Sequence, residues 1–324
     1  DSLFKIINKL KAQGVGMVYI SHKMDEIFEI SDRVLVMRDG KPTGEFVTKD
    51  ITLDDIVNSM IGRSLDNYYY KCKWNPKEEI LKVENLSLKG YFKNISFTVH
   101  AGEVVGFYGL VGAGRTEIME TIFGIRKADS GKIYLEGKEQ KIRNSVDAVK
   151  AKIAFVTENR KEQGLVLEQS CRDNIALAKL PWISKHGFVD IKETYNIYND
   201  YHDKLQISSP SSEQPVGNLS GGNQQKVVLG KWMTLGPKLL ILDEPTRGID
   251  VGSKSEIYRL IADMAEKEGM AIIVISSEMP EVMGISNRIL TISQGNLTGE
   301  LVGDEITEDS LMRAILITDS TQKA

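Results

Sequence analysis

The sequence has little of what marks a disulfide-stabilised, metal-binding or membrane-spanning protein. Its 324 residues include only two cysteines, Cys72 and Cys171, without a CxxC pair, which indicates reduced thiols rather than a disulfide framework. The four histidines show no metal-ligand spacing. Since no apolar run approaches the ~18 residues that span a bilayer, a role at a membrane would need a partner that supplies the membrane contact.

Neither sign of charge dominates. The chain has 41 Lys and Arg against 45 Asp and Glu, a net charge of −4 and a pI near 5.8. This balance gives no reason to expect a nucleic-acid-binding surface or a membrane-surface patch. Apolar residues make up 41% and charged residues 27%, as in an ordinary globular protein that is long enough for about two domains.

One long internal repeat organises the chain. Residues 14–45 align with residues 269–300 without a gap, at an offset of 255, and 13 of 32 positions are identical. Both segments pass from an apolar β-rich stretch (17–20 and 272–275) through a Ser turn, a short helix, a strand and a Gly turn to a second strand. An offset of this size corresponds to a domain rather than to a solenoid repeat.

The repeat predicts two copies of one domain. Residues 1–62 are expected to be the C-terminal part of a first copy, which lacks about 200 upstream residues by the repeat arithmetic. Residues 80–317 are expected to be a complete second copy. Residues 63–79 between them are polar and aromatic, as in a linker, and residues 318–324 form a polar tail.

A glycine-rich loop follows an apolar run over residues 103–108. Strand, glycine loop and the helical pattern EIMETIFG come in the order that a phosphate-binding loop requires. Backbone N–H groups of such a loop and the helix N-terminus surround phosphate oxygens, and the Thr116 hydroxyl can ligate Mg²⁺. Arg115 stands where the pattern GxxxxGK[ST] has lysine. The loop consists of Gly109, Leu110, Val111, Gly112, Ala113, Gly114, Arg115 and Thr116.

Two carboxylates end a second apolar run, LLIL at residues 239–242. Asp243 and Glu244 lie at the C-terminal end of a predicted buried parallel strand, which is the edge where open α/β sheets bind ligands. In this position Asp243 would hold Mg²⁺ through water. Glu244 would orient and deprotonate an attacking water.

A third motif, LSGGNQQK, precedes the helical run VVLGKWM and ends 17 residues before Asp243 of the carboxylate pair. Ser220 can cap this helix, and the exposed N–H groups at the helix start then form an anion site. The residues of this signature are Leu219, Ser220, Gly221, Gly222, Asn223 and Gln224.

The order of these motifs resembles that of an ATP-binding cassette (ABC) ATPase. The glycine loop, LSGGNQQ and LDEPT are followed by the D-loop residues Gly248, Ile249 and Asp250, and the resemblance covers essentially the whole chain. With ENRK at residues 158–161, the motifs are most similar to the second cassette of tandem monosaccharide importers of the ribose, xylose or galactose type. The resemblance implies an α/β P-loop NTPase cassette with a mixed sheet core, an antiparallel β subdomain and an α-helical subdomain near residues 160–235.

The resemblance also implies a mechanism that needs two cassettes. ABC cassettes pair head to tail, so that ATP with Mg²⁺ lies between the glycine loop of one cassette and the signature of the other. Gly109–Thr116, Asp243 and Glu244 would belong to one composite site. Ser220–Gln224 and His22, the switch histidine of the first copy, would belong to the other. Glu244 and His22 are the expected catalytic residues, and the missing first-cassette half or a second copy of the chain would complete the sites.

Three positions depart from the pattern of a competent ABC site. Arg115 replaces the lysine that reaches the β- and γ-phosphates, Glu158 stands where the glutamine loop has Gln, and Ser277 aligns with His22 at the switch position. The departures recur within the resemblance. Because the chain also holds only half of each composite site, it is predicted to hydrolyse ATP poorly or not at all. A second hypothesis places Glu158 with the two strand-end carboxylates near the γ-phosphate, where Arg115 partly offsets their charge.

Partners follow from the same resemblance. The expected function is that of an ATP-binding and ATP-hydrolysing subunit that powers sugar import through a membrane permease, at the cytoplasmic face of the cell membrane. A periplasmic or extracellular sugar-binding protein would take part indirectly, and nucleic acid would not. Trp182 would anchor a loop or contact the permease. Tyr91 and Phe92 would stack on adenine or pack within a strand.

Three alternatives remain open. The first is a nucleoside importer ATPase of the same tandem plan, and the second is a nucleotide-binding scaffold without catalysis. The third is an ABC ATPase that acts on ribosomes or DNA. The short linker of mixed charge disfavours a ribosomal role, and the absence of sustained heptads between Thr116 and Ser220 disfavours a chromosomal role.

Overall fold

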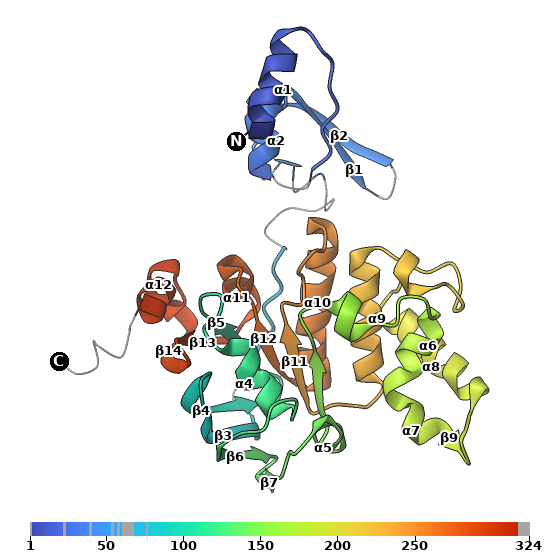
Figure 1. Ribbon diagram of the computed structural model, residues 1–324, viewed down its shortest axis with the longest axis vertical. Helices are drawn as coiled ribbons and strands as arrows, with labels where there is room; N and C mark the ends of the chain where they lie inside the picture. The colour runs from blue at the N-terminus through green and yellow to red at the C-terminus, as the bar shows by residue number, and fades with distance from the viewer. Residues whose placement is uncertain are drawn as a thin grey trace, which may run out of the picture. The chain divides into compact units, whose positions relative to one another are not determined.

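The structure is a computed structural model that describes residues 2–21, 24–38, 41–52, 55–56, 59, 68–75 and 77–316. The chain divides into two compact units, one of residues 1–68 with 250–255 and one of residues 69–249 with 256–324 (Figure 1). The limits expected for the two cassettes and their linker stay predictions.

A six-stranded sheet forms the centre of the second unit (Figure 1). Its strand order is β14-β13-β5-β12-β11-β8, and all neighbours are parallel except β13 and β14. Every residue of β5, β8, β11 and β12 is buried, as expected of parallel strands that are covered on both faces. The strands are β5 (Val104–Tyr108), β8 (Ile153–Val156), β11 (Leu239–Asp243), β12 (Ala271–Ile275), β13 (Arg288–Ser293) and β14 (Asn296–Val302).

An antiparallel sheet in the order β4-β3-β6-β7 completes the β structure of the cassette. One core cluster contains buried side chains of both sheets and of α4 (Arg115–Ile122), among them Phe97, Phe107 and Met119. This shared core fixes the start of α4, and therefore the glycine loop, against the strand ends. The four strands are β3 (Glu79–Leu88), β4 (Phe92–His100), β6 (Ser130–Leu135) and β7 (Lys138–Gln140). The predicted α/β cassette fold, with its mixed and antiparallel sheets, is confirmed.

The helical region contains α6 (Cys171–Ala176), α7 (Leu180–Ile183), α8 (Ile191–Lys204) and α9 (Gly221–Met233). These helices lie within the stretch of residues 160–235 where a helical subdomain is expected. Asp190 caps α8 by accepting a hydrogen bond from the N–H of Glu193. The region also contains a π-helical turn (Arg160–Gly164) and a short hairpin of β9 (Ser184–Lys185) and β10 (Phe188–Val189), which the sequence pattern did not indicate. The other helices of the chain beyond residue 140 are α5 (Ser145–Lys150), α10 (Val251–Glu268), α11 (Met279–Ile285) and α12 (Glu308–Leu316).

The first unit repeats the end of the second unit element by element. After α1 (Ser2–Ala12) come α2 (Met24–Ile30), β1 (Arg33–Arg38) and β2 (Lys41–Val47), and the last three each begin and end 255 residues before α11, β13 and β14. The irregularity in the hairpin register recurs as well, after Val36 in one unit and after Thr291 in the other. The sequence repeat is therefore also a repeat of secondary structure and hairpin register.

The apolar β-rich stretch at residues 17–20 forms no strand, although the equivalent residues 272–275 do. In the second unit, β12 is hydrogen-bonded to β5 on one side and to β11 on the other. A strand needs such neighbours because its N–H and C=O groups pair across the ladder. Among the described residues of the first unit, the only sheet is the β1-β2 hairpin, and Val18 and Ile20 are 92% and 93% exposed.

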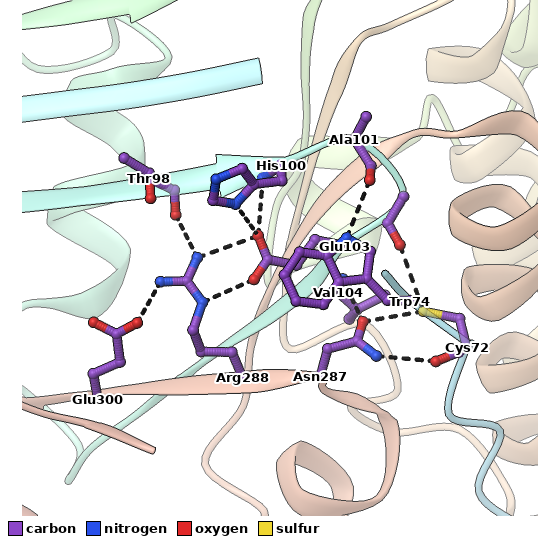
Figure 2. Close-up of polar contacts among 11 residues, drawn as sticks. Cys72, Trp74, Thr98, His100, Ala101, Glu103, Val104, Asn287, Arg288 and Glu300 are labelled. Carbon is purple, nitrogen blue, oxygen red and sulfur yellow. Dashed lines mark hydrogen bonds and ion pairs between the residues drawn. The ribbon is translucent and has the colours of Figure 1, made fainter. Parts of the chain in front are cut away.

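Part of the expected linker packs on the second unit. We call residues 69–75 the strap. The Tyr69 ring stacks on Tyr258 at 5.3 Å and occupies the space where Gly284 lacks a side chain. The buried thiol of Cys72 donates to the Oδ1 of Asn287 at 3.1 Å, and the Nδ2 of Asn287 donates to the Cys72 carbonyl at 2.9 Å (Figure 2). These contacts make the strap part of the second unit.

A buried ion pair lies beside the strap and joins the two sheets (Figure 2). Glu103 is fully buried, and its carboxylate accepts from the Nε and Nη2 of Arg288 at 2.8 and 3.2 Å and from the N–H of His100 at 2.8 Å. The remaining donors of Arg288 reach the Thr98 carbonyl and the Glu300 carboxylate, both at 2.7 Å. Such complete pairing is what a buried charge requires, since an unpaired one would stay desolvated without compensation.

Candidate functional site

The glycine loop connects the C-terminal end of β5 to the start of α4. Gly112 and Gly114 have φ of 80° and 101°, values that favour glycine because it has no Cβ. Leu110 and Val111 project at the tip of the loop and are 59% and 89% exposed. The loop therefore presents its backbone to solvent beside a helix N-terminus, which is the arrangement that binds phosphate oxygens.

Gly109 lies too close to a neighbouring strand for any side chain. A Cβ on Gly109 would be 2.2 Å from the carbonyl oxygen of Ile292, a backbone atom that cannot rotate away. We expect Gly109→Ala to lower the free energy of unfolding by about 1–3 kcal/mol, as in overpacked cores, in urea unfolding followed by tryptophan fluorescence. Gly16→Ala, followed by circular dichroism of the whole chain, is the control, because a Cβ there meets nothing within 4 Å and is expected to change little. Equal stability of Gly109→Ala and the parent would contradict the contact.

Asp243 and Thr116 meet where β11 ends and α4 begins. The Thr116 hydroxyl donates to the Oδ2 of Asp243 at 2.7 Å. The Oδ1 of Asp243 is buried and has no hydrogen-bond partner among the described residues. Burial raises the pKa of the Asp243 carboxyl to about 7, against the lowering effect of the Thr116 hydrogen bond. An unpartnered carboxylate oxygen beside a threonine hydroxyl is a ready acceptor for a cation or its water.

Glu244 is turned back over the sheet edge by its backbone. Its φ of 47° lies in the left-handed region, and its Oε1 accepts from the N–H of Ser277 at 2.8 Å. Burial raises the pKa of the Glu244 carboxyl, while the hydrogen bond from Ser277 and the charge of Arg115 lower it. At the expected switch position, the backbone of Ser277 therefore contacts the carboxylate that was predicted to be catalytic.

Arg115 points inward along the sheet edge. Its Nη1 donates to the carbonyl of Ser276 at 2.6 Å, and its Nη2 lies 3.9 Å from the Oε1 of Glu244. The side chain is 7% exposed, and burial lowers the pKa of its guanidinium. This ion pair supports half of the charge hypothesis, in which Arg115 offsets a strand-end carboxylate.

The other half of that hypothesis places Glu158 near the γ-phosphate. In the structure, Glu158 forms an ion pair with the side chain of Arg247 and is 40% exposed. The place of Glu158 beside a nucleotide stays a prediction. His22, the expected switch histidine of the first copy, lies outside the described residues.

The signature residues surround the N-terminus of α9. The Ser220 hydroxyl accepts from the Nδ2 of Asn223 at 3.0 Å and caps the helix, as its sequence position predicts. The Nε2 of Gln224 donates to the Leu219 carbonyl at 3.2 Å and also reaches the carbonyls of residues 216 and 217. Gly221 and Gly222 form the first turn. Side-chain hydrogen bonds thus hold the loop that enters the signature.

The D-loop follows Glu244 in a tight turn. The N–H of Arg247 donates to the Glu244 carbonyl at 3.1 Å, and Gly248 has a φ of 64°. Ile249 is buried, while Asp250 caps the start of α10 by accepting from the N–H of Ser253 at 3.0 Å. The structure thus places all the expected site residues except His22.

Two groups of site residues emerge. The loop Gly109–Thr116, Asp243, Glu244 and Ser277 come together at the C-terminal ends of β5, β11 and β12. None of the hydrogen bonds among the described residues joins the signature to that loop. That the signature serves a different composite site stays a prediction.

Two aromatic expectations can be compared with the structure. Phe92 is buried in the core cluster, so it packs within a strand. Tyr91 is 45% exposed and lies 4.5 Å under the guanidinium of Arg126. Trp182, on α7, is 53% exposed and is therefore not a packed loop anchor.

Comparison with known proteins agrees with this geometry. Residues 92–247 match the family described as ABC transporter. The second unit therefore contains an ABC transporter ATP-binding domain over these residues. Among the described residues, no helix combines the length and apolarity needed to cross a membrane.

Relatives of the chain include proteins named ribose import ATP-binding protein RbsA. The protein from Oceanobacillus iheyensis is 50% identical over 312 residues, which are 96% of this chain and 63% of that protein. The protein from Lacticaseibacillus paracasei is 49% identical with 96% and 62% coverage, and that from Bacillus subtilis is 46% identical with 96% and 63% coverage. The chain thus spans about 63% of the length of the curated relatives it matches.

Solved structures with the same fold include ATP-binding cassettes in an ADP conformation and in a nucleotide-free state. The ADP conformation of MJ1267, an ATP-binding cassette of an ABC transporter, has a TM-score of 0.61 at 21% identity over 73% of this chain and 96% of that one. A nucleotide-free ATP-binding cassette from an ABC transporter has a TM-score of 0.63 at 20% identity over 76% and 98%. At these identities the likeness shows the fold alone.

Proposed function

We propose that the second unit binds ATP on the loop Gly109–Thr116. The observation that carries the proposal is the convergence of this loop with Asp243 and Glu244 at one sheet edge. There the Oδ1 of Asp243 is buried without a hydrogen-bond partner among the described residues. Exposed N–H groups of the loop and the start of α4 suit the phosphates.

The same residues fit Mg²⁺. Thr116 and Asp243 offer a hydroxyl and a carboxylate oxygen, the hard ligands that Mg²⁺ prefers, and the unpartnered Oδ1 is free for a metal-bound water. Bound Mg²⁺ would neutralise phosphate charge. Of the chain's own groups, Asp243 would hold the metal water and Glu244 would orient the attacking water.

Hydrolysis by this chain alone is expected to be slow. Glu244 already accepts from Ser277 and faces Arg115, so part of its capacity as a base is engaged within the chain. The signature of this unit would serve the other site of a pair. Residues 1–62 are proposed to be the end of a first cassette, whose remaining part or a second copy would complete both sites.

For the whole protein, we propose the ATPase subunit of a sugar importer. The ribose import relatives, at up to 50% identity over 96% of this chain, support this class of substrate. Membrane permease subunits would be the partners, and a periplasmic or extracellular sugar-binding protein would act indirectly. The protein would act at the cytoplasmic face of the membrane. The nucleoside importer remains the alternative transporter, and the non-hydrolysing scaffold the alternative without catalysis.

A nucleotide titration combined with a single-turnover assay tests the proposal. By calorimetry we expect ATP to bind with Mg²⁺ at higher affinity than without it, and Thr116→Val to reduce the Mg²⁺-dependent gain about tenfold, the value of one hydrogen bond to a charged group. We expect turnover by the parent to be no faster than by Glu244→Gln.

Thr121→Val is the matched control. Thr121 lies on the same helix, but its hydroxyl donates to the Glu117 carbonyl at 2.7 Å instead of to Asp243. Its substitution is expected to leave nucleotide affinity unchanged. Absence of ATP binding would refute the proposal. Rapid Mg²⁺-dependent turnover that is lost in Glu244→Gln would contradict the expectation of slow hydrolysis.

A further inference from the structure

A buried cation lies between the D-loop and the signature. Arg160, at the start of the π-helical turn, is 9% exposed. Its Nη1 donates to the carbonyl of Arg247 at 2.6 Å and its Nη2 to the carbonyl of Gly248 at 3.0 Å. Among the described residues no carboxylate pairs with this guanidinium, and burial lowers its pKa. A buried charge held only by neutral acceptors is costly to keep, which indicates a specific role.

The third contact of Arg160 leads to the signature. Its Nε donates to the Oε1 of Gln224 at 3.4 Å. Gln224 in turn holds the entering loop through the Leu219 carbonyl, 3.2 Å from its Nε2. One planar guanidinium thus connects the carbonyls of Arg247 and Gly248, at the start of the D-loop, with the first turn of α9. A lysine ammonium could not reproduce this fork, because arginine presents five donors in a fixed plane.

The turn that carries Arg160 is itself fixed to α9. At its far end, the Gly164 carbonyl accepts from the Nζ of Lys231 at 2.5 Å, and a Cβ on Gly164 would lie 3.2 Å from Val228. Gln224, Val228 and Lys231 are four and three residues apart, so they lie on one face of the helix. This face of α9 contacts both ends of the turn. The side chain of Arg160 therefore extends from a turn that is fixed to α9 and reaches the D-loop.

Gly221 gives a second, independent observation. A Cβ on Gly221 would be 2.8 Å from the Nη2 of Arg160 and 3.0 Å from the Gly248 carbonyl. The first residue of α9 therefore lies against both the guanidinium and the D-loop, and only glycine leaves room for that approach.

We propose that Arg160 is a positioning residue. It holds two carbonyls against the N-terminus of α9, that of Arg247 just before the D-loop and that of the D-loop residue Gly248. The segment after Glu244 and the signature then move as one body, although they would serve opposite composite sites. This last consequence rests on the proposed nucleotide function. The link itself is a property of the chain without nucleotide.

Hydrogen–deuterium exchange of the full chain tests the link. In Arg160→Gln we expect amides of residues 245–249 and 217–224 to exchange about tenfold faster than in the parent, because their local opening no longer breaks the Arg160 contacts. Arg160→Lys keeps the charge and is expected to behave like Arg160→Gln. Exchange in β13 and β14 is expected to stay unchanged, which separates a local effect from global loss of stability.

Lys161→Gln is the matched control, since the adjacent Lys161 is exposed and is expected to have no effect. Gly221→Ala provides a variant that retains Arg160 and disturbs the same contact, and it is expected to raise exchange in the same two segments. Parent-like exchange in both segments of folded Arg160→Gln and Arg160→Lys would overturn the proposal. So would a uniform increase that includes β13 and β14.

A second arm adds a non-hydrolysable ATP analogue with Mg²⁺. Slower exchange in residues 109–122 would report nucleotide binding. If the analogue does not slow exchange there, the proposed function is refuted, but the comparison of variants without nucleotide still tests the Arg160 link. If the analogue binds, we expect it to change the exchange rate of residues 217–224 in the parent. In Arg160→Gln we expect this change to be about tenfold smaller. No response in the parent, or the same response in both proteins, would overturn the coupling through Arg160.

Discussion

Replacing Arg288 with methionine is expected to lower the free energy of unfolding of the second unit by about 3–5 kcal/mol. Among the described residues, the substitution leaves the fully buried Glu103 carboxylate with only the N–H and ring of His100 as hydrogen-bond partners. Much of the cost is the desolvated charge that remains, rather than the lost attraction. Urea unfolding measures the effect, and all three tryptophans (Trp74, Trp182 and Trp232) lie in the second unit and report on it.

The repeat supplies the matched control. Arg33 occupies the position equivalent to Arg288, and its Nη1 lies 3.0 Å from Glu45, the equivalent of Glu300, but these side chains are 73% and 61% exposed. Arg33→Met is therefore expected to cost less than about 1 kcal/mol, measured by circular dichroism of the whole chain.

The double variant Glu103→Leu with Arg288→Met removes both buried charges. It is expected to be more stable than Arg288→Met alone, because no carboxylate is left without its partner. Additive losses in the double variant would show that the arginine acts through packing and not through charge.

Lys231→Met is expected to change the pH dependence of stability. Burial lowers the pKa of the Lys231 ammonium to about 8, whereas the ordinary value is 10.5. Between these values the unfolded chain binds more protons than the folded chain, so this lysine makes the parent more stable as the pH rises. From pH 7 to 9.5 the stability of the parent relative to Lys231→Met should increase by about 2 kcal/mol.

Urea unfolding at intervals across this range measures the difference. The Lys231 ammonium donates to the Gly164 carbonyl, so Lys231→Met is also expected to leave an unpaired acceptor and a constant loss of about 1–2 kcal/mol. Lys161→Met, on the exposed side of the same turn, should leave both stability and its pH dependence unchanged. A difference between parent and Lys231→Met that does not vary with pH would contradict the lowered pKa.

Much of the fold could be predicted from local patterns, because each motif and the strand or helix beside it are contiguous in the sequence. An apolar run, glycines and a helix sufficed for the loop Gly109–Thr116, and Ser220 marked the start of α9. The failure at residues 17–20 has a physical reason, since an apolar run specifies a strand only when neighbouring strands accept its hydrogen bonds.

The candidate site was less predictable where contacts cross between elements. The motif identified Arg115, but its inward path to Ser276 depends on where β12 ends. Arg160 stood in the stretch ENRK beside Glu158, and nothing in the sequence joined it to the D-loop 87 residues later. Such partners are set by tertiary packing, and only a structure shows them.

Because both cysteines are buried, the rate of their alkylation reports how often the surrounding structure opens. Burial raises the pKa of the Cys72 thiol, and it raises that of Cys171 to about 11. Since the thiolate is the reactive form, an alkylating reagent meets neither sulfur until its surroundings open. Cys72 would then record detachment of the strap, and Cys171 would record opening at the start of α6. The local opening of two parts of the second unit can thus be measured separately, through cysteines that the chain already contains.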